Sequence, residues 1–327
     1  MTTEEKIFNT SISVVIPCYR ETSHILDVLK RIPEYINTIY CVDDGCPDNT
    51  GKYIEDNNDD SRVNVIFHEN NNGVGAAMIT GYKAAINDGS DIVVKIDGDG
   101  QMDPELINNF LSPILNNQSD YAKGNRFFDI ENISSMPKLR LFGNAVLSFM
   151  CKFSTGYWNI FDPNNGYTAI NTKTLKHIPL DKINDGYFFE SDMLFRLNTL
   201  RAVVVDIPMT ARYGEETSHL NIFTSAFIFS FNHSRNFFKR ILYNYFIRDF
   251  SVASLEWLIG PLMITFSLLF GINEWQISTS TGVSATAGTV MLAALPMIVG
   301  IQMVLSALSY DIENMPTIPF STLVADD

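Results

Sequence analysis

The stretch of the chain best equipped for chemistry is residues 93–103, which read VVKIDGDGQMD. An apolar run ends there in Asp97, Asp99 and Gln101, which alternate with two glycines. Glycine lets the backbone turn sharply, and carboxylate and amide oxygens are preferred ligands of hard cations such as Mg²⁺ or Mn²⁺. The pattern therefore predicts a divalent-cation site that carries the phosphates of a substrate. A solvated acidic turn after a strand is the alternative interpretation.

The same three residues would occupy positions one, three and five of an EF-hand calcium loop. Position six would then be Met102, where that loop needs glycine, and position twelve would be Asn108 in place of a bidentate glutamate. The preceding segment is also rich in β-branched residues, which favour a strand over the helix of an EF-hand. These departures exclude a calcium loop of this kind.

The elements that must position these residues alternate between strand and helix. Apolar runs predict strands at 12–16, 38–42, 63–67 and 91–96, with helices beginning near Ser23, Asp48, Val74 and Pro104. This succession predicts an α/β fold built from right-handed βαβ units, with a mostly parallel sheet and helices on both faces. Ligands of such sheets bind beyond the carboxyl ends of the strands. Polar clusters lie at three of these ends, at residues 17–21, 43–45 and 97–99.

Two later segments, residues 253–272 and 287–308, are apolar and each is about as long as the ~20 residues that cross a bilayer. Glu256 is the only charged residue in either segment. Their prolines are tolerated in membrane helices, and their small residues offer surfaces for helix contact. We therefore expect a two-helix transmembrane hairpin over residues 251–310, through which a homo-oligomer could form. Core helices of a large soluble domain are the alternative.

Charge predicts the orientation of this hairpin. Residues 222–250 mix basic with aromatic and aliphatic side chains, whereas residues 251–327 contain no lysine or arginine. The first pattern is typical of juxtamembrane amphipathic helices on an anionic membrane surface. Under the positive-inside rule, residues 1–221 form a cytoplasmic catalytic domain and residues 311–327 a cytoplasmic tail. We thus expect a multi-pass protein of the cell (plasma) membrane, with membrane lipids as partners and without a cleaved signal at its polar N-terminus.

The overall charge and the cysteines narrow the function further. The net charge is −14, and no basic patch exists apart from the membrane-proximal one, which argues against nucleic acid as a partner. The four cysteines fit neither metal-ligand spacing nor a disulfide framework, and free thiols are typical of a cytosolic domain.

Several motifs carry a resemblance to a known family: VVIPCYRE (14–21), VDDGCPDNT (42–50), NNGVGAAMITGY (71–82), KIDGDGQMDP (95–104), GNRF (124–127) and the apolar hairpin. Over residues 10–310 the chain resembles family 2 glycosyltransferases of the GT-A fold, in the branch of dolichyl-phosphate mannose synthase and bacterial undecaprenyl-phosphate glucosyltransferases. The resemblance implies a GT-A, Rossmann-like fold. It also implies inverting, metal-dependent transfer of a sugar from a UDP- or GDP-sugar to a polyprenyl phosphate.

On the donor side, the resemblance implies a nucleoside pocket lined by Pro17, Tyr19, Glu21 and Asp44. Arg212 falls where the family places a contact to the donor diphosphate. A packed aromatic is the alternative for Tyr19, and a helix cap is the alternative for Asp44.

At the reaction centre, the resemblance implies that Asp99 and Gln101 hold Mg²⁺ or Mn²⁺, with Asp97 beside them on the ribose or metal side. Arg126 and Arg140 fall where the family clamps the phosphate of its lipid acceptor. A surface ion pair is the alternative for each arginine.

A sugar hydroxyl of a lipid-linked glycan or a polysaccharide is the competing acceptor. Residues 189–192 (FESD) resemble the segment that supplies a catalytic carboxylate in relatives that use a hydroxyl, with Asp192 as the candidate base. Processive synthases of the family carry a Q-x-x-R-W motif before their membrane spans, and this sequence has none. A non-catalytic membrane scaffold that kept the fold is the remaining alternative.

Overall fold

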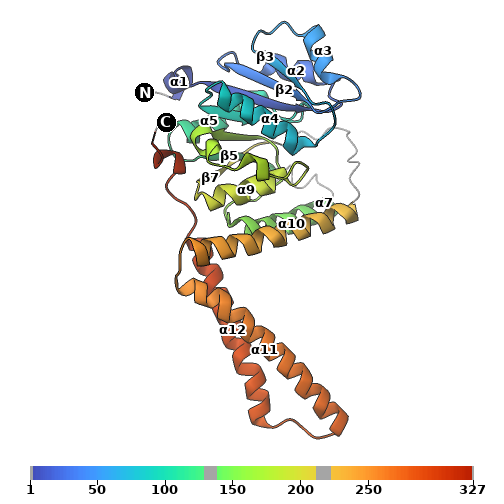
Figure 1. Cartoon of the computed structure of the whole chain (residues 1–327), viewed down its shortest axis with the longest axis vertical. Helices are drawn as coiled ribbons and strands as arrows, with labels where there is room; N and C mark the ends of the chain where they lie inside the picture. The colour runs from blue at the N-terminus through green and yellow to red at the C-terminus, as the bar shows by residue number, and fades with distance from the viewer. Residues whose placement is uncertain (1–2, 129–137, 211–221, 326–327) are drawn as a thin grey trace. The chain divides into compact units, whose positions relative to one another are not determined.

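The computed structural model describes residues 3–128, 138–210 and 222–325. The chain divides into two compact units, shown in Figure 1. The first unit comprises Met1–Phe237 and Pro316–Asp327, and the second comprises Phe238–Met315. The first boundary falls within the segment 222–250 that the sequence marks as juxtamembrane. The residues after the hairpin, which we expected to form a separate tail, pack with the first unit.

The described part of the first unit contains a seven-stranded sheet in the order β3-β2-β1-β4-β6-β5-β7. The strands are β1 (Ile12–Cys18), β2 (Thr38–Asp43), β3 (Val63–Phe67), β4 (Ile92–Lys95), β5 (Tyr121–Asn125), β6 (Thr168–Asn171) and β7 (Val204–Pro208). Strands β3, β2, β1 and β4 are parallel neighbours, and β5 is parallel to β7. Only β6, among these strands, runs antiparallel to its neighbours β4 and β5. The predicted mostly parallel sheet is confirmed.

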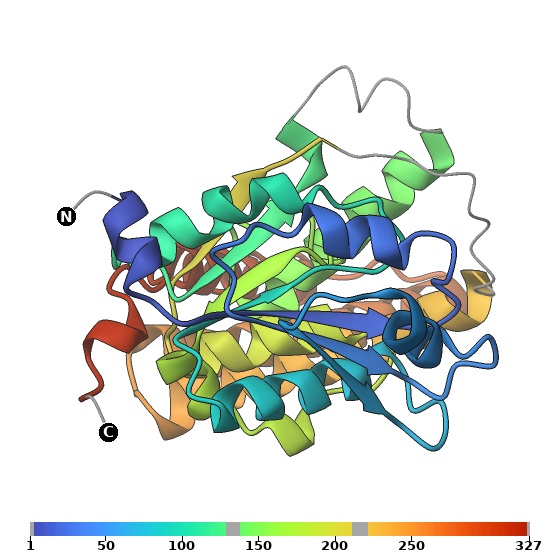
Figure 2. The ribbon, with the colours of Figure 1, turned by 90° about the horizontal axis from the view of Figure 1, so that it is seen from above.

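Helices cover both faces of this sheet, as Figure 2 shows from above. They are α1 (Thr3–Phe8), α2 (Ile25–Arg31), α3 (Thr50–Asn57), α4 (Val74–Asn87), α5 (Ile107–Leu115), α7 (Lys138–Thr155), α8 (Thr172–Lys176) and α9 (Phe189–Thr199). Short 3₁₀ turns lie at η1 (Pro104–Leu106), η2 (Arg126–Phe128), η3 (Leu180–Lys182) and η5 (Phe320–Thr322).

Alternation of apolar side chains along the strands produces two cores. Val14 and Ile16 of β1 pack in the core that includes residues of α1, α2, α3 and α5. Val15, between them, packs in the other core with residues of α4, α7 and α9. Successive side chains of a strand point to opposite faces, so a strand apolar at every position requires helices on both sides.

The second unit contains the pair of long apolar helices. Helix α10 (Ile222–Leu242) crosses the unit boundary and continues into a π-helical turn, η4 (Tyr243–Ile247). Helices α11 (Val252–Thr281) and α12 (Ala287–Glu313) then form an extensively contacting pair. Within the described residues, these two are the helices long and apolar enough to cross a membrane.

One basic residue of the juxtamembrane segment is not on the surface. Arg240 is 1% exposed, and its Nη1 and Nη2 donate to the carboxylate of Asp311, at 2.6 and 2.9 Å. The hydroxyl of Tyr245 donates to the same carboxylate at 2.6 Å. Arg240 therefore does not contribute to the basic surface of the amphipathic helix predicted here, because a carboxylate 71 residues further along the chain pairs with it inside the second unit.

A buried carboxylate helps to hold the residues after α12 within the first unit. Asp120, which precedes β5, is fully buried, and its two oxygens accept four hydrogen bonds. Thr174 Oγ1 and the backbone N–H of Val203 donate two of them, at 3.0 and 2.8 Å. The N–H groups of Phe320 and Ser321 donate the other two, both at 2.8 Å. A carboxylate satisfied in this way fixes the returning chain on the sheet domain.

Candidate active site

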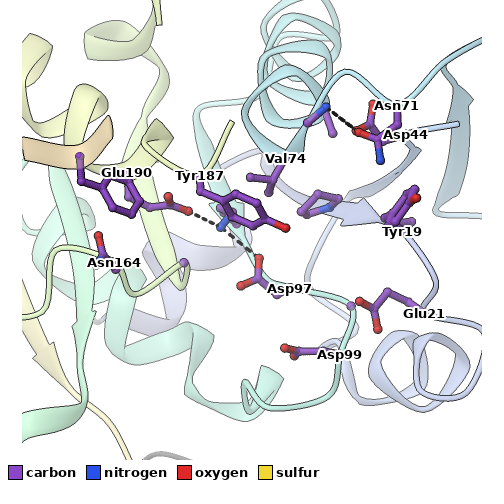
Figure 3. A pocket seen from close by; sticks show the side chains of 18 of the residues that line it. Tyr19, Glu21, Asp44, Asn71, Val74, Asp97, Asp99, Asn164, Tyr187 and Glu190 are labelled. Carbon is purple, nitrogen blue, oxygen red and sulfur yellow. Dashed lines mark hydrogen bonds and ion pairs between the residues drawn. The ribbon is translucent and has the colours of Figure 1, made fainter. Parts of the chain in front are cut away.

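A cavity of about 580 Å³ opens in the first unit. Its walls include the residues that follow β1, β2 and β4, so the predicted convergence of polar strand ends is observed. Figure 3 shows Tyr19, Asp44 and Asn71 on one side of the cavity and Asn164 and Glu190 on the other, with Asp97 and Asp99 between them. Of the predicted site residues, six line this cavity: Pro17, Tyr19, Glu21, Asp44, Asp97 and Asp99.

Asp44 shapes the side of the cavity expected to hold a nucleoside. Its Oδ1 accepts a hydrogen bond from the N–H of Asn72 at 3.0 Å, and its Oδ2 accepts one from the N–H of Gly73 at 2.7 Å. His68 Nδ1 lies 2.7 Å from Oδ1. Asp44 therefore holds the loop before α4 in place, and His68, which no sequence motif singles out, supports it.

The helix-cap alternative for Asp44 is excluded by its neighbour. Asp43 accepts hydrogen bonds from the N–H groups of Cys46 and Gly51, at 2.7 and 2.6 Å, near the start of α3. These bonds supply the capping function, so Asp44 is left to face the cavity. Tyr19, which is 40% exposed, is likewise not a packed core aromatic. Its ring lies 5.6 Å from the Arg20 guanidinium carbon and is available at the cavity wall.

The acidic turn after β4 has the predicted form. Asp99 Oδ1 accepts a hydrogen bond from the N–H of Gln101 at 2.9 Å, and Gly100 at φ +74° permits the turn between them. Gln101 itself is not among the residues that line the cavity. Within the described residues, no three His, Cys, Asp or Glu side chains form a ready-made metal cluster. One or two carboxylates with substrate phosphates commonly suffice for Mg²⁺, so Asp99, with Asp97 beside it, suits that group.

Lys95 and Glu190 are functional candidates that the sequence analysis missed. The Nζ of Lys95 lies 3.0 Å from Asp97 Oδ1 and 2.9 Å from Glu190 Oε1, and the lysine side chain is 2% exposed. Burial by itself lowers the pKa of Lys95, but the two carboxylates raise it by more, so the ammonium form is favoured. A lysine within an apolar strand was the available signal, because buried lysines need a partner.

Gly166 permits this arrangement. A Cβ at that position would lie 2.4 Å from Lys95 Nζ and 2.5 Å from Asp97 Oδ2. The residue belongs to the loop before β6, which also presents Asn164 to the cavity. The backbone thus approaches the buried ion pair so closely that no side chain fits there.

Asp192 occupies a different environment from the cavity wall. Its Oδ2 accepts hydrogen bonds from the N–H of Asn184 and from the guanidinium of Arg196, at 3.1 and 3.0 Å. Its Oδ1 accepts one from Asn236 Nδ2 at 2.9 Å. Asp192 is 6% exposed and does not line the cavity, whereas Glu190 of the same FESD segment does.

We predict that Asp192→Asn lowers turnover by less than about 10², the lower range for loss of a general base. The introduced amide faces existing donors from Arg196 or Asn236, so the main expected effect is a lower melting temperature. Steady-state rates and thermal unfolding of the purified variant measure both effects. A larger fall in turnover, together with loss of the acidic limb of the pH–rate profile, would instead show that Asp192 is the base for a hydroxyl acceptor.

Of the three predicted arginines, the structure describes the side chain of one, Arg126. Arg126 donates to the buried carboxylate of Asp162 through Nε and Nη2, at 2.7 and 2.9 Å, and it does not line the cavity. Arg140 lies in α7, but its side chain is outside the described residues. Arg212 lies in the segment 211–221, which is also outside them.

Comparisons with known proteins agree with this arrangement. The family model described as Glycosyl transferase family 2 matches residues 13–178. A UDP-N-acetylglucosamine–dolichyl-phosphate N-acetylglucosaminyltransferase from Methanococcus voltae is 31% identical over 218 residues, which are 62% of this chain and 86% of the relative. An undecaprenyl-phosphate mannosyltransferase from Micrococcus luteus is 30% identical over 200 residues, 60% of this chain and 81% of the relative.

Solved structures provide a fold comparison. Glucosyl-3-phosphoglycerate synthase from Mycobacterium tuberculosis, in complex with Mn²⁺, UDP and glucosyl-3-phosphoglycerate, matches with a TM-score of 0.55. The match covers 73% of this chain and 82% of that chain at 18% identity, so it shows the shared fold alone. The predicted GT-A architecture is confirmed.

Proposed function

Since this chain belongs to glycosyl transferase family 2, we propose that it transfers a sugar from a nucleotide sugar to a polyprenyl phosphate, with inversion at the anomeric carbon. One observation carries the proposal. A single cavity joins Tyr19 and Asp44, which suit a nucleoside, to Asp97 and Asp99, which suit a metal-bound diphosphate. Relatives named for dolichyl-phosphate and undecaprenyl-phosphate acceptors support the lipid as acceptor.

The residues of the cavity have distinct parts in this reaction. Tyr19 offers a ring to the base, and Asp44 keeps the loop at Asn72 and Gly73 against the nucleoside side. Asp99, with Asp97 beside it, would hold Mg²⁺ or Mn²⁺, which when bound neutralises charge on the leaving diphosphate, and Gln101 supports Asp99 through its backbone N–H. Inversion requires the acceptor to attack from the face opposite the leaving group, and the role proposed for the cavity walls is to hold both substrates in that line.

The acceptor determines whether the enzyme needs a base. A polyprenyl phosphate is ionised near neutral pH, so it needs positioning and no proton abstraction. The engagement of Asp192 with Arg196 and Asn236 supports that acceptor. A sugar hydroxyl remains the second candidate, because the Glu190 carboxylate lines the cavity and could serve as a base.

We propose that Arg126 and Arg140 bind the phosphate of the lipid. Each substitution by alanine is expected to raise the KM for polyprenyl phosphate about tenfold or more, because a phosphate loses a charge-assisted hydrogen bond. The dissociation constant of the nucleoside diphosphate should change less than about twofold. Arg126→Lys keeps the positive charge but loses the two parallel hydrogen bonds to Asp162. This variant therefore distinguishes a role of Arg126 in binding the lipid phosphate from a structural role in pairing with Asp162. Equal loss of donor affinity in both alanine variants would place the arginines on the other substrate.

We propose a cytoplasmic catalytic domain at the membrane face, anchored by α11 and α12. A thiol reagent that cannot cross the membrane is then expected to label Ser280→Cys from outside intact cells and Leu323→Cys only after lysis. Leu323 suits this test because it is 69% exposed, and the native cysteines Cys18, Cys41, Cys46 and Cys151 are all buried. The reverse labelling pattern would put the active site on the side without nucleotide sugars.

The proposed activity is tested with purified protein in detergent and a panel of radiolabelled UDP- and GDP-sugars. Product should appear only with added polyprenyl phosphate, and it should yield free sugar on mild acid treatment, as a glycosyl phosphate does. Polyprenol without phosphate is the matched control. Transfer to a glycan hydroxyl without polyprenyl phosphate would establish the second candidate instead.

A further inference from the structure

Lys95 is a charged group that the mechanism above leaves unused. It is one of the largest fully buried side chains in the protein, and its Nζ bonds to Asp97 on one side and to Glu190 on the other. The two carboxylates come from different elements, the turn after β4 and the start of α9. A buried ammonium group with two carboxylate partners fixes the position of both more firmly than either strand or helix does alone.

We propose that Lys95 is a positioning residue that fixes the Glu190 carboxylate as the hydrogen-bond acceptor for a hydroxyl group of the sugar being transferred. Glu190 is then the residue that distinguishes one donor sugar from its epimers. The inference rests on the proposed function only in requiring a nucleotide-sugar donor, and it adds a specificity determinant to that function.

The order of residues across the cavity supports a sugar at this place. From the nucleoside side, Figure 3 passes from Tyr19 and Asp44 to Asp97 and Asp99, and then to Glu190. A nucleotide sugar laid along this order has its diphosphate at Asp99 and its sugar towards Glu190. Asp97 and Glu190 share one Nζ, so their carboxylates lie within two hydrogen-bond lengths of each other. The sugar is joined directly to the diphosphate. The width of a pyranose ring is similar to the separation of the two carboxylates, so a sugar whose phosphate lies near Asp97 can reach Glu190.

Lys95 and its two partners differ in how far they are exposed to the cavity. All three line it, but the Lys95 side chain is 2% exposed, against 10% for Glu190 and 30% for Asp97, so the carboxylates are the accessible partners. Asp97 is assigned to the diphosphate side, which leaves Glu190 to contact the sugar. The backbone at Gly166 closes the space above Lys95 Nζ. Removing the ammonium group leaves Asp97 and Glu190 as neighbouring unpaired carboxylates, which repel and turn apart.

The test measures sugar selectivity by titration calorimetry on the full-length protein in detergent with Mg²⁺. Selectivity is defined as the ratio of dissociation constants within an epimer pair, UDP-glucose with UDP-galactose or GDP-mannose with GDP-glucose. Glu190→Gln and Lys95→Met are each expected to lower the ratio of the preferred pair about tenfold, the effect of losing a hydrogen bond to a charged group. In Glu190→Gln, which leaves the Lys95–Asp97 pair in place, the dissociation constant of UDP or GDP alone should stay within about twofold.

The double variant Lys95→Met/Glu190→Gln separates positioning from packing. If Lys95 acts through Glu190, the double variant should show no lower selectivity than the poorer single variant. It also removes one of the two unpaired carboxylates and with it their mutual repulsion, so it provides a folded form if Lys95→Met unfolds. Additive losses in the double variant would overturn the positioning role.

Lys123→Met is the matched control, since Lys123 is another fully buried lysine of the sheet, and its Nζ donates to the backbone carbonyl of Asn165. It should lower the melting temperature without changing the selectivity ratio. An equal change of ratio in this control, or an unchanged ratio in Lys95→Met, would overturn the inference.

The calorimetry and the transfer assay together distinguish failure of the role of Lys95 from failure of the proposed lipid acceptor. Selective binding of nucleotide sugars without transfer to polyprenyl phosphate would leave the role of Lys95 standing and remove the lipid acceptor. Absence of nucleotide-sugar binding in the native protein would remove both.

Discussion

Replacing Asp99 by alanine should lower kcat/KM by roughly 10³-fold or more, the size expected when a Lewis-acid site of several kcal/mol is lost. Asp99 lines the cavity between Tyr19 and Asp44 on one side and Glu190 on the other, where we propose that the diphosphate lies. Excess chelator should lower the activity of the native protein by as much as Asp99→Ala does, and added Mg²⁺ or Mn²⁺ should restore it. Neither cation should rescue the variant.

Asp103→Asn is the matched control for this experiment. Asp103 follows in the same acidic stretch, but it pairs with Arg31 and does not line the cavity. The control should therefore keep the metal requirement and most of the activity. Full activity of the native protein in excess chelator would contradict the role assigned to Asp99.

Gly166→Ala should have the second-largest effect, a fall of about 10² in kcat, the loss expected from a 1 Å misplacement of reacting groups. The added methyl group would meet Lys95 Nζ and Asp97 Oδ2 at 2.4 and 2.5 Å, well inside contact distance. Both partners are held by the buried ion-pair network, so they cannot move without displacing Glu190 as well. Steady-state kinetics with saturating donor measure the effect.

Gly143→Ala serves as the comparison, because a Cβ at that position of α7 meets nothing within 4 Å. Alanine in a helix is stabilising by about 0.5–1 kcal/mol relative to glycine, so the control should fold at least as well as the native chain. A Gly166→Ala protein with native kinetics would show that the loop relaxes and that the close approach carries no function.

The elements that were predicted correctly from the sequence are those marked by a local pattern of apolar and turn residues. Strand β3 spans Val63–Phe67 and helix α4 begins at Val74, both as expected from apolar runs and turn residues. The site at the ends of β1, β2 and β4 was predictable because parallel strands bring their carboxyl ends to one edge. The insertion of β6 antiparallel between β4 and β5 was not, since pairing across such sequence separations leaves no local pattern.

Side-chain partnerships were harder to predict than elements. Lys95 and Glu190 lie 95 residues apart, and the partner of Lys95 depends on where α9 packs. Residues two apart on a helix point in different directions, so sequence could not determine whether Glu190 or Asp192 faces the cavity. Arg240 has the sequence context of a surface cation, yet its position is decided by Asp311 far along the chain.

The four hydrogen bonds to Asp120 make the first unit depend on residues that follow both long apolar helices. Two of the four donors, the N–H groups of Phe320 and Ser321, follow the second apolar helix. Without the segment that follows that helix, both donors would be absent. The buried carboxylate would then be half-satisfied, which costs about 1–3 kcal/mol for each lost partner. The stability of the first unit is therefore set in part by a segment that lies 200 residues further along the chain than Asp120.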